Sequence, residues 1–298
     1  MDKELRQQFA AFLDEDRVDD DVTSRAVVPA AARATGTATA REAGTVAGMR
    51  EALILAELSD LEARALVADG DAVPAGTALV ELHGSAHALL GLERTLLNLM
   101  SHLSGIATQA SRAVALVAGT GTRIAATRKT LPGLRDLEKR AVILGGAEPH
   151  RRDLSAAALI KENHLVFAES LARAVADARA VLGPDVHLEV EAETIEQAVA
   201  GARAGADTVM LDNMDPWTVG SAIEALRQAG LREAVEVECS GGITPANTRE
   251  YADAGADVIS MGALSMSAPA LDINFTIAAA GSQSLAETPP APSRLRGR

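Results

Sequence analysis

Apolar and polar residues alternate with two different periods along the chain, and the period changes near residue 120. In residues 1–18, apolar side chains recur at helical spacing, with Leu5, Phe9 and Phe12 on one face. The segment 34–48 alternates small, β-branched and polar residues, a pattern typical of strands. These segments begin a first third that is predicted to be α+β.

Two further segments complete this first third. Residues 67–84 carry Gly- and Pro-bearing turns between apolar runs, which predicts a strand pair. Residues 88–117 are apolar at helical spacing over a long stretch. We expect this helical region to be broken or capped near Ser104 and Gly105, because glycine is favoured where helices end.

Beyond residue 120 the pattern becomes a repeated strand followed by a helix. Several of the helical segments end in glycine, as a left-handed helix cap prefers. The predicted strands are 122–126, 157–160, 186–190, 208–211, 235–239 and 257–261. Alternating units of this length imply a parallel sheet with right-handed crossovers. A complete or nearly complete (β/α) barrel is the first interpretation, and a doubly wound open sheet is the second.

Charged residues and glycines follow these strands at the points where they end. The set is Arg128, Lys129, Lys161, Glu191, Asp212, Ser240, Gly241, Gly242 and Gly262. In a barrel the carboxyl ends of all strands form one rim, where active sites lie. We therefore expect several cations, two carboxylates and two Gly-bearing turns to meet in one site.

The composition predicts a closely packed core and an acidic surface. Hydrophobic residues make up 48% and aromatic residues 2%, so the core is built from Ala, Val, Leu and Ile. A formal net charge of −13 argues against non-specific binding to nucleic acid or anionic membrane. Cys239 is the single cysteine, which allows no internal disulfide. With no signal-peptide pattern and no apolar run of membrane-spanning length, we expect a soluble cytoplasmic protein.

One segment reverses the sign of this charge. Residues 123–161 contain nine basic and four acidic side chains. Arg128 and Lys129 follow a predicted strand, and a positive mouth on an acidic protein selects small anions. The neighbouring Arg135, Lys139 and Arg140 are interpreted instead as a solvated basic helix face.

The other strand-end residues favour a phosphorylated sugar. Glycines at the ends of consecutive barrel strands offer backbone N–H groups to a phosphate. Glu191 and Asp212 could hold ribose hydroxyls, bind Mg²⁺ through water or stabilise a developing cation. Alternation sends Glu189 and Glu191 to the same side of the strand, so one of the two could be a solvated glutamate.

The remaining histidines and the cysteine carry less chemistry. No His, Cys or carboxylate stands at a chelating spacing from His150 or His164, so no structural zinc site is predicted. His83, His87, His102 and His187 are interpreted as structural, and Cys239 as a small strand residue. The residues alone thus predict an enzyme that combines a phosphorylated sugar with a carboxylated partner, with Mg²⁺; they do not name the reaction.

Several motifs resemble one family. The sequences ATRKTLPGLRDLEKRAV, GGAEPHRRDLS, LIKENH, EVEAET, MLDNM, SGGIT and MGALSMSAPALD stand in the order found in quinolinate phosphoribosyltransferases, the carboxylating nicotinate-nucleotide pyrophosphorylases. Earlier segments, among them ERTLLNLMSHLSGIAT, resemble the N-terminal portion of the same family. The similarity runs from about residue 14 to residue 275.

The resemblance implies a two-part α/β fold and a decarboxylating transferase. A sandwich-like α+β domain at 1–104 would precede an incomplete, seven-stranded (β/α) barrel at 105–275, with a largely disordered tail at 276–298. Quinolinate and phosphoribosyl pyrophosphate would give nicotinate mononucleotide, pyrophosphate and CO₂ in NAD biosynthesis. Homodimers would share their active sites, with higher oligomers left open.

The resemblance also assigns roles to individual residues. Quinolinate would be bound by Arg128, His150, Arg151 and Lys161, with Arg94 supplied by the partner subunit. Ribose and phosphate groups would be bound by Lys129, Glu191, Asp212, Ser240, Gly241 and Gly262. Lys129, Lys161, Glu191 and Asp212 would be catalytic, and Mg²⁺ would be held mainly through phosphoribosyl pyrophosphate, near Glu191 and Asp212.

Some positions depart from the family pattern, and other functions stay open. Ala147 stands where glycine is common, Arg152 adds a second arginine, and Glu162 replaces a more usual aspartate. The alternatives are a paralogue like the ModD proteins, a transferase for another aromatic acid, a barrel aldolase that uses Lys161 as a Schiff base, and a non-catalytic sensor of a phosphorylated ligand.

Overall fold

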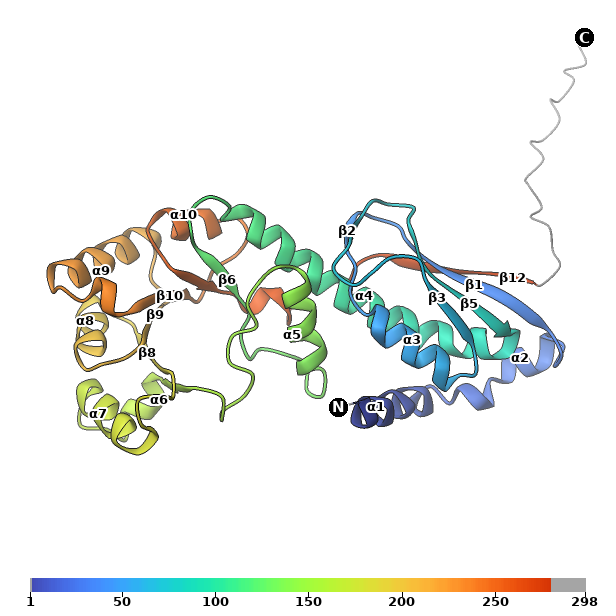
Figure 1. Ribbon diagram of the computed structural model, residues 1–298, viewed down its shortest axis with the longest axis horizontal. Coiled ribbons are helices and arrows are strands. Elements are labelled where there is room, and N and C mark those ends of the chain that lie inside the picture. The colour runs from blue at the N-terminus through green and yellow to red at the C-terminus, as the bar shows by residue number, and fades with distance from the viewer. Residues whose placement is uncertain (1, 280–298) are drawn as a thin grey trace, which may run out of the picture.

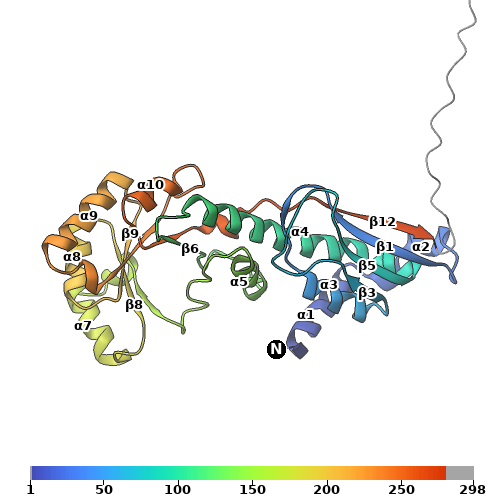
Figure 2. The same cartoon turned by 45° about the horizontal axis from the view of Figure 1, so that its top comes forward.

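A computed structural model describes residues 2–279 as an elongated molecule with two parts (Figures 1 and 2). One part is an antiparallel sheet with helices packed on it, and the other is an open barrel of parallel strands. Helix α4 (Ala86–Leu116) contacts strands of both parts and joins them. Within the described residues, no helix combines the length and apolarity that a bilayer crossing requires.

The N-terminal part is built on a four-stranded antiparallel sheet of order β12-β1-β5-β3. Along β1, buried residues alternate with more exposed ones, as expected for a sheet with one covered face. The sheet strands are β1 (Arg33–Ala40), β3 (Glu62–Ala65), β5 (Ala78–Ser85) and β12 (Ile273–Ala279). The other elements are α1 (Asp2–Glu15), η1 (Val18–Asp20), α2 (Val22–Val27), α3 (Met49–Leu58) and the short pair β2 (Gly44–Thr45) and β4 (Ala72–Val73).

Strand β12 corrects the predicted start of the C-terminal tail. The chain leaves the barrel and pairs along β1, with Ile273 opposite Ala40 and Ala279 opposite Ala34 (Figure 1). The prediction of a tail from residue 276 is therefore wrong for residues 276–279, whereas 280–298 lie outside the described residues. Gly36 makes this pairing possible, because a Cβ there would lie 2.2 Å from the Phe275 ring.

Helix α4 is continuous through the position where a break was predicted. Gly105 is buried in mid-helix, and a Cβ on it would lie 2.1 Å from the Pro269 carbonyl oxygen. The glycine therefore permits close packing of the 269–270 segment on the helix and does not mark a helix end. Ser104 also lies within the helix, and its buried hydroxyl donates a hydrogen bond to the Ala47 carbonyl at 2.9 Å.

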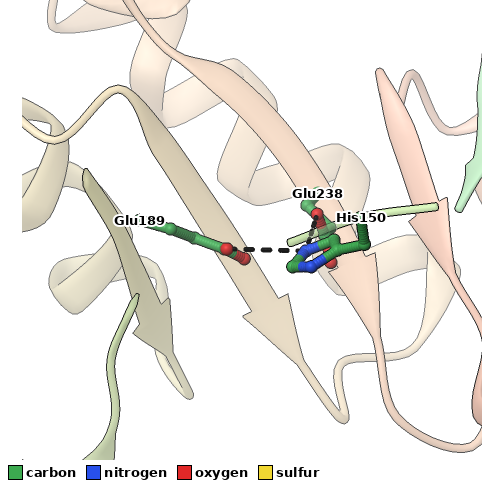
Figure 3. Close-up of side chains that lie close together, drawn as sticks. All are labelled: His150, Glu189 and Glu238. Carbon is green, nitrogen blue, oxygen red and sulfur yellow. Dashed lines mark ion pairs between the residues drawn. The ribbon is translucent and has the colours of Figure 1, made fainter. Parts of the chain in front are cut away.

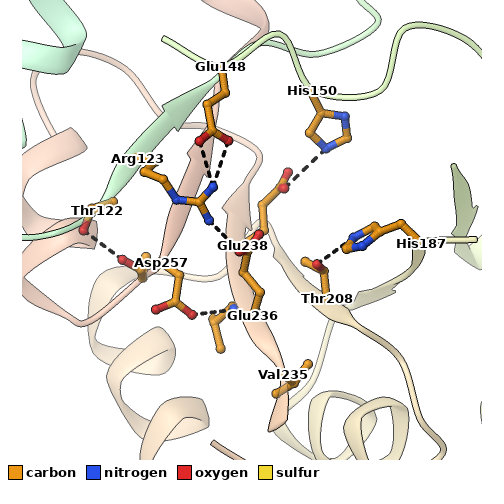
Figure 4. Close-up of polar contacts among 12 residues, drawn as sticks. Thr122, Arg123, Glu148, His150, His187, Thr208, Val235, Glu236, Glu238 and Asp257 are labelled. Carbon is orange, nitrogen blue, oxygen red and sulfur yellow. Dashed lines mark hydrogen bonds and ion pairs between the residues drawn. The ribbon is translucent and has the colours of Figure 1, made fainter. Parts of the chain in front are cut away.

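The second part confirms the predicted barrel with parallel strands. All six predicted strands are present, in the order β6-β11-β10-β9-β8-β7. Their bounds are β6 (Arg123–Ala125), β7 (Ala158–Ile160), β8 (Leu188–Ala192), β9 (Thr208–Asp212), β10 (Glu236–Ser240) and β11 (Val258–Ser260). A seventh segment lies alongside β6 and pairs with it through one parallel bridge, between Ala125 and Glu148. Arg123 reinforces it with contacts to Glu148 at 2.8 Å and Glu236 at 2.5 Å (Figure 4).

Helices cover the outside of this barrel and follow the strands as the period predicted. Their bounds are α5 (Arg135–Leu144), α6 (Glu162–Leu165), α7 (Leu171–Leu182), α8 (Ile195–Arg203), α9 (Pro216–Gln228), η2 (Arg232–Ala234), α10 (Thr248–Asp253) and η3 (Gly262–Leu264). Side chains such as Thr194 and Asp215 accept hydrogen bonds from the first turns of α8 and α9. The carboxyl ends of all six strands therefore open on one side.

Candidate active site

The strand ends surround a cavity of about 510 Å³. The predicted residues that line it are Arg128, Lys129, His150, Arg151, Lys161, Glu191, Asp212, Ser240 and Gly241. Two predicted residues do not line it. Gly262 lies beneath Lys129, and Arg94 is exposed on α4 beside a different hollow that includes Leu131 and Pro132. The cavity thus gathers cations and carboxylates from strands that are far apart in the sequence.

Two carboxylates and a lysine form one wall. Lys161, directly after β7, donates to Glu191 Oε2 at 2.5 Å. Asp212, at the end of β9, accepts from Asn213 Nδ2 at 2.5 Å. Burial, and then repulsion from Glu191, raises the pKa of Asp212 above its ordinary value. Lys161 and Lys129 act in the opposite direction on Asp212, so the two carboxylates of this wall are stabilised by positive charge nearby.

Two glycine turns follow the neighbouring strands β10 and β11, and the first of them lines the cavity beside Asp212. Gly241 has a φ of 85°, and a Cβ on it would lie 2.3 Å from Asn213 Oδ1. A Cβ on Gly262 would lie 2.7 Å from Lys129 Cδ, so this glycine lets the lysine side chain pass. The N–H groups of Gly241 and Gly242 have no hydrogen-bond partner among the described residues. Such free amides at a strand end suit the oxygens of a phosphate.

A buried group of His150, Glu189 and Glu238 forms the cavity floor (Figure 3), and His150 and Glu238 of this group line the cavity directly. His150 Nε2 lies 3.3 Å from Glu238 Oε2 and 3.6 Å from Glu189 Oε2. Both glutamate side chains are at most 5% exposed, and their Oε1 atoms have no hydrogen-bond partner. The possibility that Glu189 or Glu191 is a solvated glutamate is therefore wrong, because both carboxylates point into the barrel.

The floor group has the donor types of a metal site. Its three potential ligand atoms lie within 4.8 Å of one another, and it is the single such group of His, Cys, Asp and Glu found in residues 2–279. Sequence spacing cannot reveal it, since its members come from β8, β10 and a loop. Burial, and then repulsion from Glu238, raises the pKa of Glu189 to about 9.

Replacement of Glu189 by glutamine should flatten the pH dependence of stability. The ordinary pKa of this carboxyl is 4.5, so between about pH 4.5 and pH 9 the folded chain holds a proton that the unfolded chain has lost. Wild-type stability should therefore fall with rising pH in this window, by at most about 3 kcal/mol between pH 6 and pH 8. Urea unfolding of both proteins at the two pH values measures it, and parallel pH profiles would contradict the assignment.

The predicted basic helix face is partly wrong. Lys139 on α5 is 5% exposed, and Nζ donates to the carbonyls of Thr127 and Pro149. Arg140 pairs with Asp69 at 2.6 Å and with the buried Glu51 at 3.2 Å, both in the N-terminal part. Lys139 therefore connects α5 to two loops, and Arg140 connects it to the N-terminal part. The spacing of charged residues along a helix does not show whether such side chains are buried in contacts of this kind or exposed to solvent.

The histidines interpreted as structural do make structural contacts. His187 lies 3.0 Å from Thr208 Oγ1 at the amino end of β8 (Figure 4), and His83 lies 2.8 Å from Thr35 Oγ1. His102 Nε2 on α4 lies 2.9 Å from the fully buried Glu138 of α5.

Arg152 is exposed and pairs with Asp136 at 2.6 Å, so this additional arginine points away from the cavity lining.

The mouth of this incomplete barrel combines arginines, lysines, carboxylates and glycine turns of the kind that bind phosphate. These features define a class of enzyme that acts on small polyanions. Family models identify the class more closely. The model described as "Quinolinate phosphoribosyl transferase, C-terminal domain" matches residues 106–276, and the corresponding N-terminal domain model matches residues 21–104. The chain belongs to the quinolinate phosphoribosyltransferase family.

Individual relatives agree with this membership. A probable nicotinate-nucleotide pyrophosphorylase [carboxylating] of Methanothermobacter thermautotrophicus is 41% identical over 264 residues, covering 87% of this chain and 93% of the relative. The nicotinate-nucleotide pyrophosphorylase [carboxylating] of Mycobacterium leprae is 39% identical, covering 86% and 91%. The crystal structure of NadC from Streptococcus pyogenes has a TM-score of 0.86 at 33% identity, covering 94% of this chain and 98% of that one.

Proposed function

We propose that this protein transfers the phosphoribosyl group of phosphoribosyl pyrophosphate to quinolinate with loss of CO₂, which gives nicotinate mononucleotide and pyrophosphate. The main support is the single cavity that joins arginines from two loops to a pair of carboxylates and the glycine turn after β10. A phosphate, a pyrophosphate and a dicarboxylate together need several cations in one place, which the remainder of the acidic chain does not offer.

In this proposal quinolinate occupies the side of Arg128, His150 and Arg151. Arginine can bind a carboxylate through two parallel hydrogen bonds. Arg128 Nε is buried without a partner, and burial lowers the pKa of Arg151 below its usual range. Both guanidinium groups would therefore gain from an anion in the cavity. The 5′-phosphate would lie at the glycine turns that follow β10 and β11.

The reaction then needs stabilisation of a cationic ribose. The pyridine nitrogen forms a bond to the anomeric carbon while the bond to pyrophosphate breaks, so the transition state resembles an oxocarbenium ion. Glu191 and Asp212 supply fixed negative charge beside this carbon. Lys129 and Lys161 face the leaving pyrophosphate as point charges.

Decarboxylation follows from the new bond to nitrogen. A quaternary ring nitrogen accepts the electron pair that the adjacent carboxyl group leaves behind when CO₂ departs. A proton then adds to that ring carbon, which gives nicotinate mononucleotide. The steps balance without a redox cofactor.

Magnesium is part of this proposal. Glu191 and Asp212 offer hard carboxylate oxygens, and the repulsion between them favours a divalent cation nearby. They would hold Mg²⁺ that enters with phosphoribosyl pyrophosphate. When bound, the ion would neutralise and orient the pyrophosphate.

The proposal includes a homodimer with shared sites in a cytoplasmic setting. Arg94 is exposed on α4 and does not line the cavity of its own chain, so a second copy would have to bring it there. A Schiff-base aldolase is less consistent with the cavity, because it needs a free amine and Lys161 is in an ion pair with Glu191.

Pyrophosphate release tests this function. With Mg²⁺ present, release is expected only when phosphoribosyl pyrophosphate and quinolinate are both supplied, and a chelator should stop it. The Arg152→Ala variant serves as the control, because this exposed arginine points away from the cavity and should retain activity. Release that is independent of the acid would contradict the proposal.

A further inference from the structure

Lys139 connects the two loops that carry the two arginines of the cavity, Arg128 and Arg151. Its side chain leaves α5 inside the protein, and Nζ donates to the Thr127 carbonyl at 3.3 Å and to the Pro149 carbonyl. Thr127 immediately precedes Arg128 and Lys129, and Pro149 immediately precedes His150 and Arg151. One buried ammonium group therefore sets the separation between two pairs of cavity-lining side chains.

The helix that presents Lys139 is itself fixed. Glu138 accepts a hydrogen bond from the Leu131 amide at 3.3 Å and contacts His102 of α4. On the next residue, Arg140 pairs with Glu51 and Asp69 of the N-terminal part. The contacts of Glu138 and Arg140 thus hold α5 in place. The position of α5 then fixes the two loops through the hydrogen bonds of Lys139.

The charges around Lys139 depend on what the cavity contains. Arg128 and Arg151 from the two loops and Arg135 from its own helix oppose its charge, and Asp136 favours it. Burial, and then these arginines, lowers the pKa of Lys139 to about 8. His102 of α4 lies against the same helix and is paired with Glu138. An anion bound by Arg128 and Arg151 would offset their repulsion and favour the charged lysine.

We propose that Lys139 is a positioning residue for the two anion-binding loops and that its ammonium charge is coupled to anion binding, so that binding takes up a proton. This inference rests on the anion-binding role in the proposed function but not on the transfer reaction. In the free protein, about half of the Lys139 side chains are neutral at pH 8. An anion draws these back to the charged form, and its affinity therefore falls as the pH rises above 8.

Sulfate is a suitable probe, because it carries two negative charges and does not titrate near pH 8. Calorimetry at pH 8 in two buffers of different ionisation enthalpy measures proton uptake. Wild type is expected to take up a fraction of a proton for each sulfate bound. Lys139→Met should bind sulfate about tenfold more weakly and take up less of a proton. Because Glu189 can also titrate here, the difference between the two proteins assigns the proton.

Two further variants separate positioning from general stability. Lys139→Gln retains a hydrogen-bond donor without the charge, so it should recover part of the affinity and none of the proton uptake. Arg179 on α7 is a matched control, since it donates to the carbonyls of Val186 and Gly205 at the opposite end of the barrel. Arg179→Met should lower stability and leave sulfate affinity unchanged.

Several outcomes would overturn the inference. These are wild-type affinity and proton uptake in Lys139→Met, equal losses of affinity in Lys139→Met and Arg179→Met, or no sulfate binding by wild type. If Lys139→Met does not fold, full proton uptake in Lys139→Gln would overturn it. Proton-linked sulfate binding without any transfer to quinolinate would contradict the proposed function and support this inference.

Discussion

Replacement of Lys161 by alanine is expected to lower kcat/KM by about 10²–10³-fold. Lys161 is the cation paired with Glu191, whose side chain is 8% exposed. Without it, Glu191 loses its ion-pair partner, and the carboxylates of Glu191 and Asp212 repel both the phosphoribosyl donor and its leaving group more strongly. Steady-state kinetics with each substrate varied in turn, together with single-turnover rates, would measure the loss.

A double variant distinguishes this electrostatic role from a folding defect. Lys161→Met with Glu191→Gln removes both charges while it retains both side-chain volumes, so it should restore stability and leave activity low. Activity of Lys161→Ala within tenfold of wild type would contradict a role for Lys161 in the transfer. Full recovery of activity in the double variant would assign the lysine to stability alone.

Replacement of Arg94 by alanine is expected to lower activity by at least about 10²-fold and to leave the folded chain intact. The side chain is exposed in one chain and lines no part of its cavity, so its truncation removes no internal contact that the cavity needs. In the proposed dimer the same side chain completes the partner's quinolinate site. Thermal unfolding and turnover of the purified variant test both halves of this statement.

Mixing Arg94→Ala with Lys161→Ala gives a sharper test of the shared site. Each hybrid dimer would have one cavity with an intact Lys161 and an intact Arg94, and its other cavity would lack both. Random exchange makes half of the dimers hybrids, so activity should recover to about a quarter of the wild-type value. No recovery in hybrids verified by differential tagging would contradict a shared site.

The barrel strands could be predicted from the sequence because each is a short apolar run followed by a polar end and a helix. The strands of the N-terminal sheet are harder. Strand β12 pairs with β1 across more than 200 residues, and four of its seven residues are exposed, so it has no clear period of its own. Gly105 misled the helix assignment for a related reason: its role is close packing against Pro269, which sequence position does not reveal.

The candidate site shows the same division. Residues at the strand ends, such as Lys161 and Asp212, could be predicted to converge because parallel strands end on one side. Glu238 and Lys139 could not. The first lies two residues before a strand end and reaches the floor only through the alternation of β10, and the second carries the sequence pattern of a surface lysine. In both cases the sequence shows the charge, and only the three-dimensional packing shows that it is buried.

The most direct test of the proposed reaction follows the carbon that is lost. Quinolinate labelled in the carboxyl group beside the ring nitrogen would be incubated with phosphoribosyl pyrophosphate and Mg²⁺, and unlabelled nicotinate would be offered in a parallel reaction. One labelled CO₂ is expected for each nicotinate mononucleotide formed from quinolinate, with little product from nicotinate. Product formed equally well from nicotinate, or no labelled CO₂ from quinolinate, would contradict it.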